Sequence, residues 1–66
     1  MKNKIKIERA INNLTQEQLA EKVTVTRQTI NAIELNKFVP STVLALKIGK
    51  VFKKSVNEIF FLDDED

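Results

Sequence analysis

The chain has 66 residues with neither cysteine nor histidine, and this combination limits what it can fold into. A domain of this size buries only about 60% of the surface that its unfolded chain exposes, so a single core gives marginal stability. Small domains usually add disulfides, a structural metal or oligomerisation. Disulfides and the usual zinc ligands are missing here. The sequence therefore predicts one domain over residues 1–66 that has no metal site and is stabilised by forming an oligomer.

The missing residue types also exclude several classes of function. The chain has no imidazole base and no thiolate nucleophile. Gly49 is its only glycine, so it has no glycine-rich phosphate loop. No apolar run approaches the roughly 18 residues that a membrane span requires. We expect a cytoplasmic protein that is not an enzyme, with no cofactor, no small-molecule substrate and no membrane partner.

The spacing of apolar residues predicts five consecutive short helices and an all-α fold. Apolar residues that recur at i, i+3, i+4 and i+7 mark the face of a helix that packs against a core. The faces predicted to be buried, from the first helix to the fifth, are Ile7, Ala10, Ile11 and Leu14; Leu19, Ala20 and Val23; Ile30 and Ile33; Leu44, Ile48, Val51 and Phe52; and Val56 and Ile59.

Capping residues predict where three of the helices begin. Thr15 and Gln18 match a capping box, in which each side chain bonds to the backbone N–H of the other residue. Ser55 and Glu58 match a second capping box. Thr26 is a favourable N-cap residue. The second, fifth and third helices are therefore predicted to begin directly after Thr15, Ser55 and Thr26.

The net charge of +2 conceals an uneven distribution. Residues 1–54 contain all 11 Lys and Arg residues and carry a charge of +7, whereas residues 55–66 carry −5. Charge distributed in this way indicates an anionic partner for the basic part of the chain, such as a nucleic acid. A solvated lysine face is the alternative. The acidic tail, residues 63–66, is expected to lie away from such a partner.

Three consecutive large apolar residues, Phe60 to Leu62, cannot all face one core. One or two of them cap the helices, or the segment is extended and buries its other face against a second copy of the chain. It can also pair with residues 1–7, which alternate as a strand does, in a short terminal β-ribbon. The residues expected at a dimer interface are Phe60, Phe61, Leu62 and Ile5.

The second and third predicted helices, joined by a turn of three residues, match helix-turn-helix geometry over about residues 15–35. Ala20 supplies the small residue needed where the two helices cross, and Ile30 and Ile33 attach the third helix to the core. The strings LTQEQLAEKV (residues 14–23) and VTRQTINAIE (residues 25–34) resemble the phage-repressor/Cro-like (Xre-family) helix-turn-helix domain. The resemblance covers roughly residues 5–62 and is greatest to small stand-alone dimeric repressors of that family.

The resemblance implies a lambda-repressor-like domain of five helices that places its third helix in the major groove of double-stranded DNA. Arg donates two hydrogen bonds to guanine, and Gln and Asn each form two with adenine. By position, the implied base-contacting residues are Arg27, Gln28, Asn31 and Thr29. The implied phosphate-contacting residues are Gln16, Thr24, Thr26, Asn36, Lys37 and Phe38.

Two positions depart from the family pattern. Thr24 occupies the turn position that is usually glycine, and a β-branched residue is strained at positive φ. Either the turn bends differently or the strain is retained. Asn36 replaces the glycine expected after the third helix, which is a milder change because Asn tolerates the left-handed conformation.

These observations predict a sequence-specific regulator of transcription, in the simplest case a homodimeric repressor that binds an inverted repeat in nucleoid DNA. Two recognition helices related by a two-fold axis would contact half-sites about 34 Å apart, or a multiple of that distance. The alternative is an antitoxin or another protein-interaction module. Such a module would neutralise a protein partner through residues 60–62 and regulate its own operon.

Overall fold

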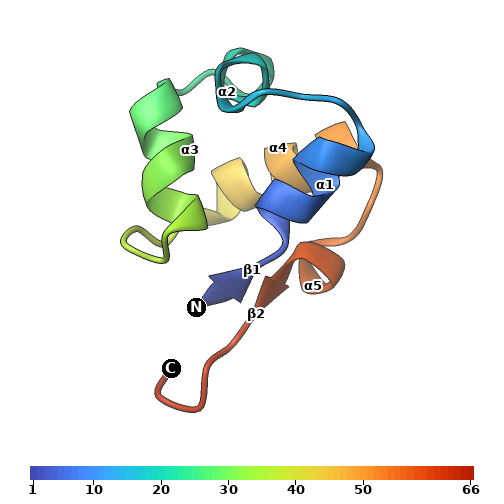
Figure 1. Ribbon diagram of the computed structural model, residues 1–66. Helices are drawn as coiled ribbons and strands as arrows, with labels where there is room; N and C mark the ends of the chain where they lie inside the picture. The colour runs from blue at the N-terminus through green and yellow to red at the C-terminus, as the bar shows by residue number, and fades with distance from the viewer.

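The computed structural model describes residues 1–66 as five short helices and a two-stranded sheet (Figure 1). α2 lies at one end of the molecule, whereas both strands and both termini lie at the opposite end. None of the helices combines the length and the apolar content that crossing a membrane requires. The predicted all-α fold with a short terminal β-ribbon is confirmed. The elements are β1 (Lys2–Asn3), α1 (Ile5–Ile11), α2 (Gln16–Val23), α3 (Arg27–Glu34), α4 (Thr42–Phe52), α5 (Val56–Ile59) and β2 (Phe60–Phe61).

A core of 12 buried apolar residues draws on all five helices and on β2. The predicted inward faces of α2 to α5 are confirmed, and Val51 and Val56 pack against the core while partly buried. Each fully buried Leu or Ile stabilises the fold by about 1.5–3 kcal/mol relative to an exposed one. The core residues are Ile5, Leu19, Ala20, Val23, Ile30, Ile33, Leu44, Ala45, Ile48, Phe52, Ile59 and Phe60.

The predicted inward face of α1 is wrong for Ile7, Ala10 and Ile11, which are exposed, whereas Leu14, after the helix, packs against the core while partly buried. Ile7 and Ile11 are 56% and 66% exposed, and the buried residues of this helix are Ile5 and Glu8. The Glu8 carboxylate accepts a hydrogen bond from Lys54 Nζ at 2.7 Å, and this bond raises the pKa of Lys54. A carboxylate can be buried when it is paired in this way. The spacing of apolar residues does not reveal an ion pair of this kind. For that reason it predicted the exposed face of α1 as the buried one.

Four helices end in the same backbone motif, and none of them uses glycine for it. In this Schellman motif a residue with positive φ lets the next N–H bond back to the helix, as Val25 N–H does to the Ala20 carbonyl at 3.0 Å. Asn36 adopts the left-handed conformation, as predicted. The residues with positive φ, between 54° and 64°, are Asn13, Thr24, Asn36 and Lys53.

The helix starts are capped by the predicted side chains. The Thr15–Gln18 capping box is present before α2, and Thr26 Oγ1 accepts a hydrogen bond from the Thr29 N–H before α3. At the start of α5 the Glu58 carboxylate accepts from the Ser55 N–H at 3.0 Å. These local bonds replace the intrahelical partners that the first N–H groups of a helix lack. They fix where each short helix begins.

The two ends of the chain pair in an antiparallel β-ribbon. Lys2 lies opposite Phe61, and Asn3 lies opposite Phe60. The Lys4 N–H extends this pairing with a 2.8 Å hydrogen bond to the Ile59 carbonyl. The ribbon therefore joins the entry to α1 to the exit from α5.

This ribbon changes which residues are available to a second copy. Ile5 is 0% exposed and Phe60 is 6% exposed, so both are core residues of this fold and are removed from the predicted dimer interface. Phe61 is half-buried, and Leu62 is 79% exposed. Of the four predicted interface side chains, only those of Phe61 and Leu62 lie at the surface.

The acidic tail folds back over the N-terminus. The Met1 ammonium lies 3.1 Å from a carboxylate oxygen of Asp66 and 3.2 Å from one of Asp63. The hydrogen bond to Asp66 raises the pKa of the Met1 amino group. The tail lies at the opposite end of the molecule from α2 (Figure 1).

Gly49 is required in α4 because the following loop approaches it closely. A Cβ atom at this position would lie 2.8 Å from the carbonyl oxygen of Lys54, which is part of the backbone. The Lys54 N–H in turn bonds to the Gly49 carbonyl at 3.0 Å. The close approach is therefore part of the motif that ends α4.

We expect Gly49→Ala to lower the free energy of unfolding by about 1–2 kcal/mol, because overpacking outweighs the gain in helix propensity. Urea denaturation at a fixed protein concentration measures the change. The exposed neighbour provides a control, since Lys50→Ala should change stability by no more than about 0.5 kcal/mol. A Gly49→Ala protein as stable as the parent would contradict the close approach.

Candidate nucleic-acid interface

The turn between α2 and α3 is tight and strained. Thr24 adopts φ 64° and ψ 45°, so the strain that its β-branched side chain predicts is retained. A non-glycine residue in this region costs of the order of 1–3 kcal/mol. Ala20 is 2% exposed and leaves room for the turn to bring α3 across α2. The turn holds α3 at the edge of the molecule, with its first residue close to the end of α2 (Figure 1).

The first turn of α3 exposes polar side chains that have no bonding partner within the protein. Arg27 and Gln28 are exposed, and neither side chain has a hydrogen bond or an ion pair within the protein. Asn31 lies one turn further along, so it shares the face of α3 with both of them. Together these three side chains offer a guanidinium and two amides, the groups that read base edges in the major groove.

Thr26 and Thr29 bond to each other at the start of α3. Their hydroxyl oxygens are 3.0 Å apart, and either can donate the proton. Thr29 is half-buried, whereas Thr26 is exposed. The Thr29 hydroxyl therefore has one partner within the protein.

A buried ion pair attaches α3 to α1. Arg9 Nε lies 2.7 Å from one carboxylate oxygen of Glu34, and its Nη2 donates to the other oxygen at 3.0 Å. The two side chains are 15% and 7% exposed. The hydrogen bonds to Glu34 raise the pKa of Arg9. Arg9 also donates to the Leu14 carbonyl at 3.0 Å, so a single guanidinium joins α1, the following loop and α3.

Gln16, the first residue of α2, is tied to the same carboxylate. Its Nε2 donates to Glu34 Oε1 at 3.2 Å and to Asn31 Oδ1 at 3.1 Å. The side chain of Gln16 is therefore turned toward α3. Its backbone N–H lies in the first turn of α2, where a helix attracts an anion.

The loop after α3 is held by the N-terminal strand. Asn3 Nδ2 donates to the Ile33 carbonyl at 2.9 Å and to Asn36 Oδ1 at 3.3 Å. Lys37 and Phe38 follow in this loop and are exposed. Phe38 is 49% exposed and is not part of the core.

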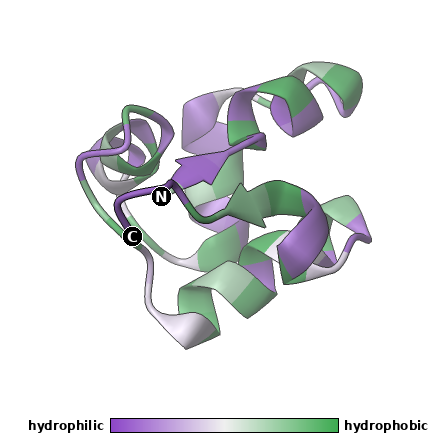
Figure 2. Ribbon diagram, turned by 90° about the horizontal axis from the view of Figure 1, so that it is seen from below, coloured by the Kyte–Doolittle hydropathy of each residue, from purple (hydrophilic) through white to green (hydrophobic).

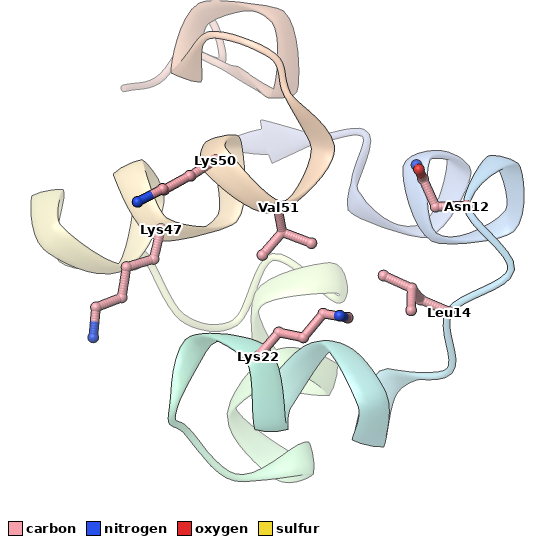
Figure 3. A pocket seen from close by; sticks show the side chains of 6 residues that line it. All are labelled: Asn12, Leu14, Lys22, Lys47, Lys50 and Val51. Atoms are coloured by element: carbon pink, nitrogen blue, oxygen red, sulfur yellow. The ribbon is translucent and has the colours of Figure 1, made fainter.

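A basic hollow of about 650 Å³ lies between α2, α4 and the loop after α1 (Figure 3). Lys22 lines it from α2, and Lys47 and Lys50 line it from α4 with their side chains pointing away from Val51. None of these lysines forms an ion pair. Because no base-contacting candidate lines the hollow, we interpret it as a source of long-range positive charge.

Most of the predicted site residues fall at the start of α2, in the turn, at the start of α3 and in the loop after α3. Sequence reasoning missed Arg9, Glu34 and Asn3, which hold these segments in place. Their partners lie 25 or 30 residues away along the chain. No local pattern identifies such pairs, so only the folded structure reveals them.

Comparisons with known proteins agree with this geometry. A family model described as Helix-turn-helix matches residues 5–59, which span α1 to α5. HTH-type transcriptional regulator MJ0272 of Methanocaldococcus jannaschii is 53% identical over 66 residues, covering all of both chains. HTH-type transcriptional regulator YgzD of Bacillus subtilis is 50% identical over 66 residues, again covering all of both. An HTH-type transcriptional regulator of Archaeoglobus fulgidus is 46% identical over all of this chain and 93% of its own.

We expect Arg9→Met to destabilise the protein by about 3 kcal/mol or more, because it leaves the buried Glu34 carboxylate unpaired. Urea denaturation measures the loss. Lys6→Met, an exposed change on the same helix, should cost no more than about 0.5 kcal/mol. Replacing both partners, as Arg9→Met with Glu34→Leu, should recover much of the stability, since two apolar side chains leave no unpaired charge. If Arg9→Met costs no more than Lys6→Met, the ion pair does not attach α3.

Proposed function

The chain belongs to the Xre family of helix-turn-helix transcriptional regulators, and we propose that it is a homodimeric repressor that reads an inverted repeat in double-stranded DNA. The observation that carries the proposal is the first turn of α3. There, Arg27 and Gln28 are exposed and have no bonding partner within the protein, and the helix that carries them is attached to α1 by an ion pair that is largely buried. Because the helix is already formed, binding has to order these side chains but not the backbone that carries them.

We assign the reading of base edges to Arg27, Gln28 and Asn31. Arg27 suits the two acceptors of guanine, and Gln28 suits the acceptor and donor of adenine. Thr29 is assigned a lesser part, the contact of its methyl group with a thymine methyl or a phosphate. Each good two-bond pair discriminates against the wrong base by about 1–3 kcal/mol.

Phosphate contacts are assigned to the segments on either side of α3. The backbone N–H groups at the start of α2 and the exposed residues of the two loops can hold the DNA in register, as phosphate contacts do. The basic hollow and the charge of +7 over residues 1–54 add attraction at longer range. The residues assigned to phosphate are Gln16 through its backbone N–H, and Thr24, Thr26, Asn36, Lys37 and Phe38.

The proposed second subunit covers an apolar surface at the end of the molecule that holds β2. A hollow of about 360 Å³ there is lined by Leu46, Val39 and Phe60 among others, and α4 and β2 are mostly apolar in the view from below (Figure 2). Val39, Leu46 and Leu62 are each more than half exposed. A chain of 66 residues has a small core, and burying these side chains in a dimer would add to it. We keep Phe61 and Leu62 in the proposed interface.

The protein would then act in the cytoplasm, on DNA of the nucleoid. A dimer places two copies of α3 on one face of the double helix, in half-sites about one helical turn apart. The acidic tail lies at the end away from α2, where it would not meet the phosphates of the bound site. We propose no catalytic activity.

Binding to the DNA upstream of its own gene, measured at several salt concentrations, tests the base readers. We expect an inverted-repeat footprint and an affinity that falls steeply with salt. Arg27→Ala and Gln28→Ala should each lose about 1–3 kcal/mol of discrimination at one base pair of each half-site. The control Lys37→Ala should weaken binding to all sequences alike and lower the salt slope by about one. If the Arg27 and Gln28 variants discriminate between sequences as the parent does, the assignment is wrong.

Sedimentation tests the proposed dimer. The parent should sediment as a dimer, and Leu62→Glu or Leu46→Glu should sediment as a folded monomer, because a buried unpaired carboxylate opposes association. Ile7→Glu, a matched change on the exposed face of α1, should stay dimeric. A parent that is monomeric, or that associates only with a different protein, would contradict the homodimer and favour the antitoxin alternative.

A further inference from the structure

The carboxylate of Glu34 sets the orientation of two amide side chains in turn. An ionised carboxylate only accepts hydrogen bonds, and Glu34 accepts two from Arg9. The Gln16 atom that lies 3.2 Å from Glu34 must therefore be the amide nitrogen, which has hydrogens to donate. The other amide orientation would place two oxygens against each other.

The same nitrogen then orients Asn31. Gln16 Nε2 has two hydrogens, and its second contact is 3.1 Å away, so the Asn31 atom at that position must be the oxygen. Asn31 Nδ2 has no partner in the protein and is left for DNA. The charge of Arg9 on α1 therefore determines, through Glu34 on α3 and Gln16 on α2, which end of the Asn31 amide is presented to DNA.

Both hydrogens of Gln16 Nε2 are used inside the protein. The side chain has no donor left for a phosphate oxygen, so a phosphate at the start of α2 would be bound by backbone N–H groups. The position of this side chain therefore favours a role in base recognition over a role in phosphate binding.

Resting on the proposed function, we propose that Gln16 is a positioning residue that holds Asn31 in the one orientation that reads adenine. The Gln16 bond occupies one lone pair of Asn31 Oδ1. The second lone pair and the Nδ2 hydrogens remain, and these match the N6 donor and the N7 acceptor of adenine in the major groove. Without Gln16 the Asn31 amide can turn over and present the wrong groups to the base.

The experiment selects duplex sites from a random DNA pool with the parent, Gln16→Met and Asn31→Ala. The base pair at which Asn31→Ala loses its preference identifies the position that Asn31 reads. At that position the parent should prefer adenine by about 5- to 150-fold. Gln16→Met should lose at least about fivefold of this preference while keeping the preferences at the positions read by Arg27 and Gln28.

Two further measurements separate positioning from a general structural effect. In an Asn31→Ala background, Gln16→Met should change base preference no further, because the two residues act as one unit. Glu21→Gln, an exposed change on the same helix, should leave every base preference unchanged. Gln16→Ala serves as a second variant, since it removes the donor to Asn31 without placing a second carboxylate beside Glu34. It should lose the adenine preference in the same way.

Three outcomes would overturn the proposal. Unchanged adenine preference in Gln16→Met and Gln16→Ala would show that Asn31 needs no positioning. A uniform loss of affinity on all sequences, with a salt slope lower by about one, would make Gln16 a phosphate contact. If the parent selects no site at all, the proposed function fails and this inference fails with it.

Discussion

The ion pair between Arg9 and Glu34 is the contact on which the proposed DNA-reading surface depends. It is nearly closed to solvent, and it lies where α1, the loop after it and α3 meet. An isolated charge in that position would be strongly destabilising, so each partner requires the other. The pair also holds Gln16 and, through it, Asn31. α3 is therefore held by charge at its last residue, Glu34, as well as by the buried side chains of Ile30 and Ile33.

The rest of the fold supplies a frame for that surface from few residues. Strained left-handed residues end four helices without glycine, and the β-ribbon joins both ends of the chain. Asn3 then connects the ribbon to the end of α3 and to the loop that follows. The core is small, and exposed Leu46 and Leu62 remain at the end away from α2. A dimer through that end would enlarge the buried surface and also pair two recognition helices.

Features that depend on neighbouring residues in the chain could be predicted from the sequence, whereas most features that depend on distant contacts could not. Thr15, Gln18 and Thr26 cap helices through neighbours three residues away, and α4 buries an unbroken apolar stripe, so both were predicted correctly. The inward face of α1 was not, because Glu8 is buried by a bond to Lys54, 46 residues further along. Ile5 and Phe60 were expected at an interface because the apolar pattern of the two chain ends, although it predicted the β-ribbon, does not show which of their side chains the core takes up. The positions of Arg27 and Gln28 agree with the sequence expectation, but their roles in binding stay a prediction.

Amide chemical shifts of the isotopically labelled protein, followed as its operator duplex is added, test the central claim most directly. The account predicts that the largest changes fall on the backbone at the start of α2 and on residues 27–31. The side-chain amide of Asn31 should also shift, while that of Gln16 keeps its hydrogen-bonded position. Largest changes on the outward face of α1, at Ile7 and Ile11, or around Lys47 and Lys50, would contradict it. In that case DNA would be bound by a different surface, and α3 would not be its reading element.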